Sequence, residues 1–284
     1  MITQLDTKTV YSFMDSLVSI KKYVQRAKDL GYKSLGMMDM DNLYGAYHFL
    51  EEAKAAGLQP LLGLEMEIYK DGNPLNLRLL ALDSQGYRNL MKISTLKMMN
   101  RQNWEDFQHL FKGLALIVPI FEGVDQLDLG LDFYVGVFPD TSRQELTRPV
   151  LPLHTVRYFE QGDLETLQML RAIRDNISLR EVGHLSSHEF LLAPESLEEA
   201  FVENFPESLP NLEKLIADVH YEINTDLKLP RFNPERPAVD ELRELAKTGL
   251  AKRGLAGTAY QVRLDQELDV IHQMGFDDYF LIVW

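Results

Sequence analysis

The sequence contains no cysteine among its 284 residues. Disulfide bonds and thiolate metal sites are therefore excluded, and the composition is compatible with a reducing compartment. No apolar run approaches the ~20 residues that a membrane-spanning helix needs. The first residues also lack the basic and apolar regions of a secretory signal. Together these absences predict a cytoplasmic protein without a membrane partner.

Basic residues are also scarce, because 29 lysines and arginines stand against 43 aspartates and glutamates. The formal net charge is −14, and an acidic surface repels phosphate, so we expect this chain alone to bind DNA poorly. Apolar residues make up 45% and charged residues 25% of the chain, as in globular proteins. The length is sufficient for one large α/β barrel or for two ordinary domains.

Residues 31–65 predict a strand, a helix and a second strand, which together form a parallel βαβ unit. The strands are expected at 34–38 and 61–68. Between them, Asp41 or Asn42 is expected to cap the helix, and Gly57 is expected to end it in the left-handed conformation. The apolar face of this helix is predicted from positions that recur at helical spacing, namely Leu43, Ala46, Tyr47, Leu50 and Ala53.

The sequence within this unit resembles the PHP (polymerase and histidinol phosphatase) domain at the N-terminus of bacterial DNA polymerase III alpha subunits. Residues 38–46 read MDMDNLYGA, where that family has a pattern close to TDHGNL[FY]GA. Residues 54–65 read KAAGLQPLLGLE, where the family has KAAGIxPIIGxE. The resemblance implies a distorted (β/α)7 barrel of TIM type, and the alternation of predicted strands and helices agrees with an α/β fold.

The same resemblance implies a metal site of about nine side chains, most of them histidines. Most of the positions that can be aligned no longer carry ligands. The first motif has Gln4, Asp6 and Lys8 where the family has histidines, and Met40 follows Asp39 where the family has Asp-His. A thioether is a poor ligand for a hard divalent cation, and a lysine adds positive charge where the ion would lie.

Later motifs have changed in the same way. Ile120 aligns with a cysteine or its substitute, Thr155 with an aspartate and Arg157 with a histidine. Only Asp15 and Glu65 keep a ligand type. We therefore predict a degenerate site with no bound metal and no catalytic residue, and we hypothesise that Gln4, Asp6, Lys8 and Arg157 form a salt-bridged network in place of the ions.

Two histidines, His184 and His188, lie four residues apart, as zinc ligands on a helix would. Gly183 and the adjacent serines favour a loop at this place, so a hydrogen-bonded or surface role is the preferred interpretation. His154 is one residue away from the position of the lost ligand, and in a strand this offset turns the side chain to the other face.

The C-terminal part changes character at Asp226, where three prolines fall within twelve residues. We predict a PHP-like barrel at 1–225, a linker at 226–238 and a helical start of the polymerase palm at 239–284. Helices are expected at 239–253 and 260–274, and the apolar residues 280–284 are expected to form a strand. The resemblance implies that the chain is a fragment whose parent continues beyond Trp284.

Two functions from different classes follow from the resemblance. The first is structural: the domain supports the palm and thumb of a DNA-directed DNA polymerase, needs no cofactor, and leaves DNA and replisome subunits to downstream regions that use Mg²⁺. The alternative is an active metal-dependent phosphoesterase or 3′-5′ proofreading exonuclease. Histidines at the strand ends distinguish the two, because an active site would need them.

Overall fold

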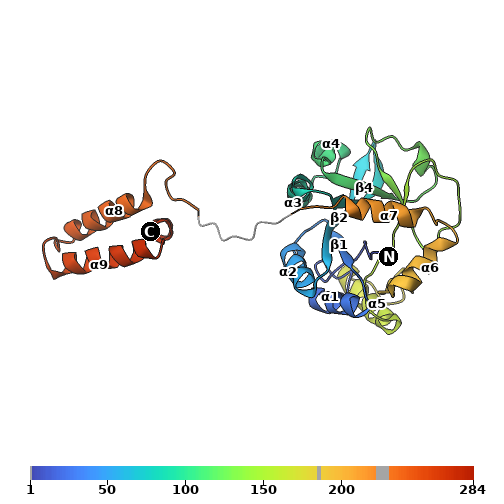
Figure 1. Cartoon of the computed structure of the whole chain (residues 1–284), viewed down its shortest axis with the longest axis horizontal. Coiled ribbons are helices and arrows are strands. Elements are labelled where there is room, and N and C mark those ends of the chain that lie inside the picture. The colour runs from blue at the N-terminus through green and yellow to red at the C-terminus, as the bar shows by residue number, and fades with distance from the viewer. Residues whose placement is uncertain (1, 184–186, 222–229) are drawn as a thin grey trace. The chain divides into compact units, whose positions relative to one another are not determined.

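The computed structural model describes residues 2–183, 187–221 and 230–284. The chain divides into two compact units, residues 1–223 and residues 224–284 (Figure 1). Within the described ranges, no helix has both the length and the apolar character that crossing a bilayer requires. Residues 226–229 of the predicted linker lie outside these ranges.

The first unit is an α/β fold built on one curled sheet of six strands in the order β1-β2-β3-β4-β5-β6. The strands β1 and β2 pair in parallel, as predicted, and so do β4 with β5 and β5 with β6. The strand bounds are Ser34–Met40, Gln59–Lys70, Asn73–Ala81, Leu114–Pro119, Tyr134–Val137 and Val150–Pro152.

The strand β3 departs from the expected alternation, because it is antiparallel to both β2 and β4. No helix separates β2 from β3. Instead, Asp71 and Gly72 join them with φ angles of 51° and 79°, which is the backbone of a tight hairpin turn that favours an Asp-Gly pair. This turn brings residues of β2 and β3 directly opposite each other.

The N-terminal segment is hydrogen bonded to β1 at one edge of the sheet and to the chain that follows β6 at the other. On one side, the amide of Gly36 in β1 donates to the carbonyl of Gln4 at 2.7 Å. On the other side, the amide of Lys8 donates to the carbonyl of Val156 at 2.9 Å, and the amide of Val156 donates to the backbone carbonyl of Asp6 at 2.9 Å. The chain that follows β6 is thereby joined through residues 4–8 to β1.

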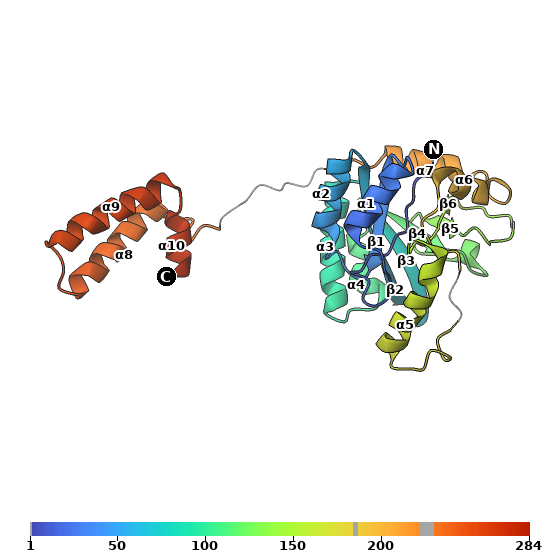
Figure 2. The ribbon, with the colours of Figure 1, turned by 90° about the horizontal axis from the view of Figure 1, so that it is seen from below.

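Helices lie outside this curled sheet, and α1, α2 and α3 stand side by side along one flank (Figure 2). An apolar core fills the space between the helices and the strands and runs through the whole unit. The helix bounds in this unit are Ile20–Asp29 (α1), Ala46–Ala56 (α2), Ser84–Met98 (α3), Trp104–Phe107 (α4), Leu164–Asp175 (α5), Pro194–Val202 (α6) and Ser208–Ala217 (α7).

The start of α2 differs from the prediction. The helix begins at Ala46 with Gly45 as its N-cap, and neither Asp41 nor Asn42 caps it. Asn42 instead bonds locally, accepting from the amide of Tyr44 at 3.1 Å. Because of this local turn, the helix starts only at Ala46, and Leu43 lies before it. Gly57 ends the helix with a φ of 77°, as expected.

The buried face of α2 is also rotated from the prediction. Tyr47, which was expected to face the core, is 58% exposed. Phe49 is fully buried in its place. A tyrosine at the edge of an apolar face can keep its hydroxyl in water, so its spacing alone does not bury it.

The second unit consists of three helices, α8 (Ala238–Lys252), α9 (Ala259–Gln273) and α10 (Asp277–Val283). The predicted strand at 280–284 is wrong, because these residues mostly belong to α10. Asp277 and Asp278 occupy the first turn of that helix, where carboxylates favour helical structure. Among the described residues of this unit, Leu268 and Leu281 are the apolar side chains that are buried.

The close contact between the N-terminal segment and β1 predicts a strong effect of Gly36→Ala. A Cβ atom at Gly36 would lie 2.1 Å from the carbonyl oxygen of Leu5. The backbone must therefore move, and we expect a loss of about 1–3 kcal/mol in the free energy of unfolding, measured by urea denaturation. Gly162→Ala is the matched control, because no atom lies within 4 Å of its added Cβ. Equal stability of the two variants would contradict this packing.

Candidate functional site

Four charged side chains meet inside the curled sheet and pair with one another. The Lys8 ammonium contacts the Asp6 carboxylate and lies 2.7 Å from Oε2 of Glu65. Arg78 reaches both carboxylates as well, at 3.4 Å from Asp6 and 3.2 Å from Glu65. Thr155 donates to Oδ2 of Asp6 at 2.8 Å, the same oxygen that Arg78 contacts. We call Asp6, Lys8, Glu65 and Arg78 the central ion cluster.

The local structure explains why these four residues meet. Asp6 and Lys8 are two residues apart on an extended segment, so their side chains point to the same face. Glu65 of β2 and Arg78 of β3 are direct partners in the antiparallel register set by the hairpin. The N-terminal segment and the hairpin therefore each contribute one acid and one base, and the cluster is electrically balanced.

Because the four side chains of the central ion cluster are buried, their positive and negative charges must compensate each other. Asp6 and Lys8 are completely inaccessible, and Glu65 and Arg78 are no more than 6% exposed. Burial alone would raise the carboxyl pKa values, but the charges of Lys8 and Arg78 outweigh it and hold the pKa of Asp6 far below its ordinary value. The pKa of Glu65 is lowered by the same two cations against the same effect of burial. Both acids therefore remain ionised.

A second charged group forms around Asp15, nearer the surface. Its carboxylate contacts Arg157. Its Oδ1 also lies 2.7 Å from Nε of Arg171 and 3.0 Å from Nη1 of Arg174, both of which belong to α5. Arg157 in turn lies 3.3 Å from Glu189. We call Asp15, Arg157, Arg171, Arg174 and Glu189 the outer ion cluster.

The pKa values in the outer ion cluster follow its geometry. Burial lowers the pKa of Arg157, but Asp15 and Glu189 outweigh it, and the net pKa is raised, so this side chain is a permanent cation. Burial raises the pKa of Glu189 despite the opposing charges of Arg157 and Arg171. The ion pairs of the cluster connect Asp15 with α5 directly and with Glu189 through Arg157.

Asp39, at the end of β1, is held by neutral donors. Its carboxylate accepts from the amide of Thr9 at 2.6 Å, from the Thr9 hydroxyl at 2.7 Å and from the Ser12 hydroxyl at 2.6 Å. Burial raises its pKa even so. All these donors come from the N-terminal loop, so Asp39 fixes that loop to the sheet.

The other predicted positions carry no metal ligand. Gln4 donates to the carbonyls of Asp6 at 3.0 Å and of His154 at 2.6 Å. Met40 lies opposite Glu65 in the β1–β2 register. Ile120 follows β4 and packs against the core.

Of the histidines considered above, the structure describes His154 and His188. His154 is buried, its Nε2 lies 2.9 Å from the carbonyl of Phe190, and burial lowers its pKa. His184 lies outside the described residues, so the pair with His188 is not described. Within the described residues, no group of three or more histidines, aspartates or glutamates has a geometry that would hold a metal ion.

The structure therefore supports the hypothesis of a salt-bridged network and changes its membership. Asp6 and Lys8 do pair, but Arg157 belongs to the outer ion cluster and Gln4 makes hydrogen bonds only. Sequence reasoning missed Arg78 and Glu189. The signal for Arg78 was present, since it is a lone charge within the apolar strand β3. No local signal identifies Glu189, whose partner Arg157 is 32 positions earlier in the chain.

Comparison with known proteins assigns the family. The sequence profile of the PHP domain family matches residues 4–144. These residues belong to the PHP domain family. A second profile, described as the bacterial DNA polymerase III alpha NTPase domain, matches residues 240–284. The PHP domain and the second unit are thus matched by separate profiles.

Full-length relatives extend this assignment. The chain is 47% identical over all of its length to DNA polymerase III subunit alpha of Streptococcus pyogenes serotype M1, and it covers 28% of that protein. It is 28% identical to DNA polymerase III subunit alpha of Bacillus subtilis, with 99% of the chain and 29% of the relative aligned. The chain is therefore homologous to the N-terminal part of DNA polymerase III alpha subunits and spans less than a third of their length.

Two solved structures resemble the fold at low sequence identity. A putative metal-dependent phosphoesterase from Bifidobacterium adolescentis aligns with 76% of this chain and 74% of its own, at 13% identity and a TM-score of 0.32. An amidohydrolase from Chromobacterium violaceum with bound sulfate and no metal aligns with 70% of this chain and 96% of its own, at 10% identity and a TM-score of 0.35.

The side chains present in this PHP domain do not fit a metal centre. A cation between Asp6 and Glu65 would have to replace the Lys8 ammonium, which lies 2.7 Å from Glu65 and also contacts Asp6. Arg78 occupies the other side of both carboxylates. Positive charge is therefore already supplied by the chain itself where an ion would be needed.

The lowered pKa values predict a pH dependence of stability. An acid whose pKa is lower in the folded state stabilises the fold above its unfolded pKa, and it loses this contribution as pH falls through the folded pKa. Asp6 and Glu65 are both of this kind. We expect the free energy of unfolding to fall as pH drops below about 5, because protonation of Asp6 and Glu65 removes their ion pairs.

Two variants separate this effect from other acids. Lys8→Met removes one of the two positive charges that lower both pKa values, so the loss of stability in acid should become smaller. Asp39→Asn should keep the full acid loss, because the pKa of Asp39 is shifted upwards and contributes with the opposite sign. Urea unfolding over a pH series measures all three proteins. An unchanged acid loss in Lys8→Met would contradict the assignment to the central ion cluster.

Proposed function

We propose that this chain is the N-terminal part of a DNA polymerase III alpha subunit, a DNA-directed DNA polymerase that acts in replication. In this proposal, the PHP domain binds no metal, has no catalytic activity, and supports the polymerase structurally. The homology over the full length of the chain favours the first statement. The central ion cluster favours the second.

The observation that carries the proposal is the position of Lys8. Its ammonium lies between Asp6 and Glu65, which are acids of the kind that bind metal ions in hydrolases. Metal-dependent phosphoester hydrolysis needs a cation that activates water and binds phosphoryl oxygens. A buried lysine that is fully engaged with two carboxylates does neither, but it does hold the N-terminal segment against β2.

Support of this kind would extend to the whole curled sheet. The N-terminal segment joins β1 to the chain after β6, and we propose that it serves as the seventh strand of a distorted (β/α)7 barrel. The ion clusters then act as internal cross-links at the place where the barrel closes. A closed, rigid barrel is suited to carrying a larger neighbouring part of the same chain.

The remaining parts of the proposal concern the parent polymerase. Residues 226–238 would link the barrel to a helical start of the palm at 239–284. Palm and thumb would be its direct partners, and DNA, replisome subunits and catalytic Mg²⁺ would bind to downstream regions. The formal charge of −14 agrees with a chain that leaves DNA binding to other regions. The parent would act in the cytoplasm.

The alternative is a working metal-dependent phosphoesterase or 3′-5′ proofreading exonuclease. It would require ions to displace Lys8 and Arg78 from the two acids, and the displaced cations would then be buried without partners. Leaving one buried charge unpaired costs about 3–5 kcal/mol. The electrically balanced cluster therefore favours the structural role.

Metal content and hydrolysis test the proposal together. The purified chain is dialysed against trace zinc and manganese and then analysed for bound metals. It is also assayed on a phosphomonoester and on single-stranded DNA. We expect less than a stoichiometric amount of either metal and no turnover, because the central ion cluster already satisfies the carboxylates.

A metal-dependent phosphatase treated in the same way is the positive control for loading and assay. Two or three ions per chain together with hydrolysis would contradict the proposal and would favour the enzymatic alternative. Bound metal without hydrolysis would also contradict the proposal, because the proposal states that the PHP domain has no metal-binding site.

A further inference from the structure

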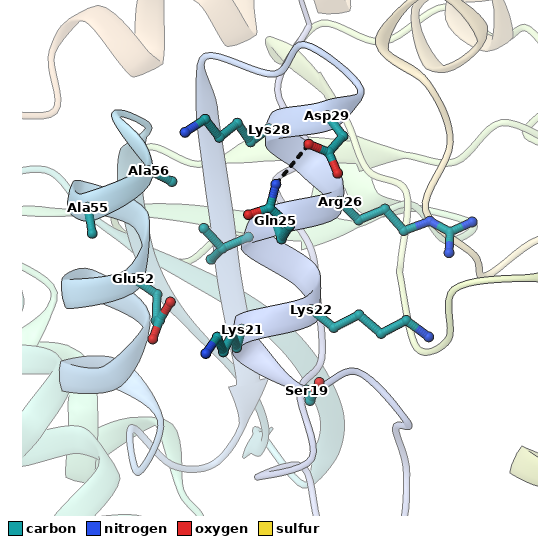
Figure 3. Close-up of a pocket in the computed structure, with 11 residues that line it drawn as sticks. Ser19, Lys21, Lys22, Gln25, Arg26, Lys28, Asp29, Glu52, Ala55 and Ala56 are labelled. Carbon is teal, nitrogen blue, oxygen red and sulfur yellow. Dashed lines mark hydrogen bonds between the residues drawn. The ribbon is translucent and has the colours of Figure 1, made fainter.

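A groove of about 850 Å³ runs between α1 and α2 on the outer side of the sheet. Figure 3 shows that Lys21 and Lys28 extend from α1 toward α2, whereas Lys22 and Arg26 extend away from it. The buried side chain of Val24 and the small side chains of Ala55 and Ala56 also line the groove. Ala55 and Ala56 supply the accessible apolar surface of the groove, because Val24 is only 2% exposed.

The charges of the groove are opposite to those of the chain. Four basic residues and two acidic residues, Asp29 and Glu52, line it, whereas the whole chain carries a net charge of −14. Both acids have neighbours. Asp29 accepts from Gln25 at 2.8 Å, and Glu52 lies 3.5 Å from His48.

The four basic residues differ in how they are engaged. Lys22 lies 4.5 Å from the ring centroid of Phe159, and Arg26 pairs with Glu160 at 2.8 Å. In the described part of the chain, Lys21 and Lys28 have no acidic group within 4.0 Å. The two cations that face the groove are therefore the ones left unpaired.

The spacing of the unpaired lysines suits an α-helical ligand. Lys21 and Lys28 are seven residues apart on α1, which corresponds to about 10.5 Å along the helix axis. Two carboxylates seven residues apart on a docked helix have the same separation. Apolar residues three and four positions after the first carboxylate lie on the same face and would contact Ala55 and Ala56.

We propose that the groove docks an amphipathic acidic helix of a partner protein, with the pattern Glu-x-x-Leu-Leu-x-x-Glu. The carboxylates pair with Lys21 and Lys28, and the leucines cover the apolar floor. The side of the ligand that faces α2 is neutral, because Glu52 would repel a third acid there. This site lies on the outer helices and does not depend on the proposed function of the sheet interior.

A single-stranded nucleic acid is the other anionic ligand that two lysines suggest. It is less suited to this groove, because none of the described residues that line it is aromatic and could stack on a base. The floor is apolar instead, and the acidic charge of the rest of the chain disfavours a polyphosphate. An acidic helix uses both the floor and the lysines.

Fluorescence anisotropy tests the proposal with the full 284-residue chain. The probe is a labelled helical peptide of about 18 residues that contains the proposed pattern. We expect saturable binding at low salt, and we expect Lys21→Glu/Lys28→Glu to weaken it about tenfold or more. The same variant should gain affinity for a peptide in which both glutamates are lysines. Ala55→Leu, which fills the floor, should also weaken binding of the acidic peptide.

Lys92→Glu is the matched control, because Lys92 is an exposed lysine on the separate helix α3. It changes the net charge in the same direction and should leave peptide affinity unchanged. Three results would overturn the proposal: no binding by the wild-type chain, equal binding by the Lys21/Lys28 variant, or tighter binding of a single-stranded oligonucleotide through the same lysines. All the variants carry substitutions at exposed positions, so unfolding is not expected to obscure the result.

Discussion

The ion pairs of Lys8 are the interaction on which the rest of the first unit depends. Its ammonium is fully buried, and taking such a charge out of water is costly unless carboxylates replace the lost hydration. Asp6 comes from the same segment, but Glu65 comes from β2, so satisfying Lys8 holds the N-terminal segment against the sheet. Arg78, which belongs to β3, pairs with the same two carboxylates and so links that strand to the N-terminal segment as well. Because this segment is hydrogen bonded to β1 and to the chain that follows β6, the pairing of one side chain also stabilises the closure of the sheet.

The same constraint explains how a PHP fold retains its shape without the side chains of a metal centre. Metal ions at the ends of several strands cross-link those strands and neutralise their acids. Here, basic side chains occupy the corresponding places, one cluster around Lys8 and Arg78 and another around Arg157. Cations that belong to the chain are always present, and they leave no open coordination position for water or phosphate. In the proposed function, the structural role of these charged positions is thereby separated from hydrolysis.

Much of this arrangement follows from the sequence, and the exceptions have physical causes. The βαβ unit and the C-cap at Gly57 could be predicted, because they depend on local pattern and residue chemistry. The antiparallel orientation of β3 was missed because its signal is the short Asp71-Gly72 turn. Residues 280–284 were predicted as a strand from apolar character alone, which does not distinguish strand from helix in short runs. Glu189 was missed because its pairing with Arg157 depends on tertiary contact.

A double-mutant cycle between Lys8 and Glu65 tests the central claim most directly. The free energy of unfolding is measured for the wild type, Lys8→Met, Glu65→Gln and the double variant. If the two side chains stabilise the closure as a pair, each single variant leaves a buried charge poorly compensated. The double variant should then be more stable than the sum of the single losses predicts, by about 1–3 kcal/mol. Losses that simply add would contradict the claim that this ion pair holds the N-terminal segment in the sheet.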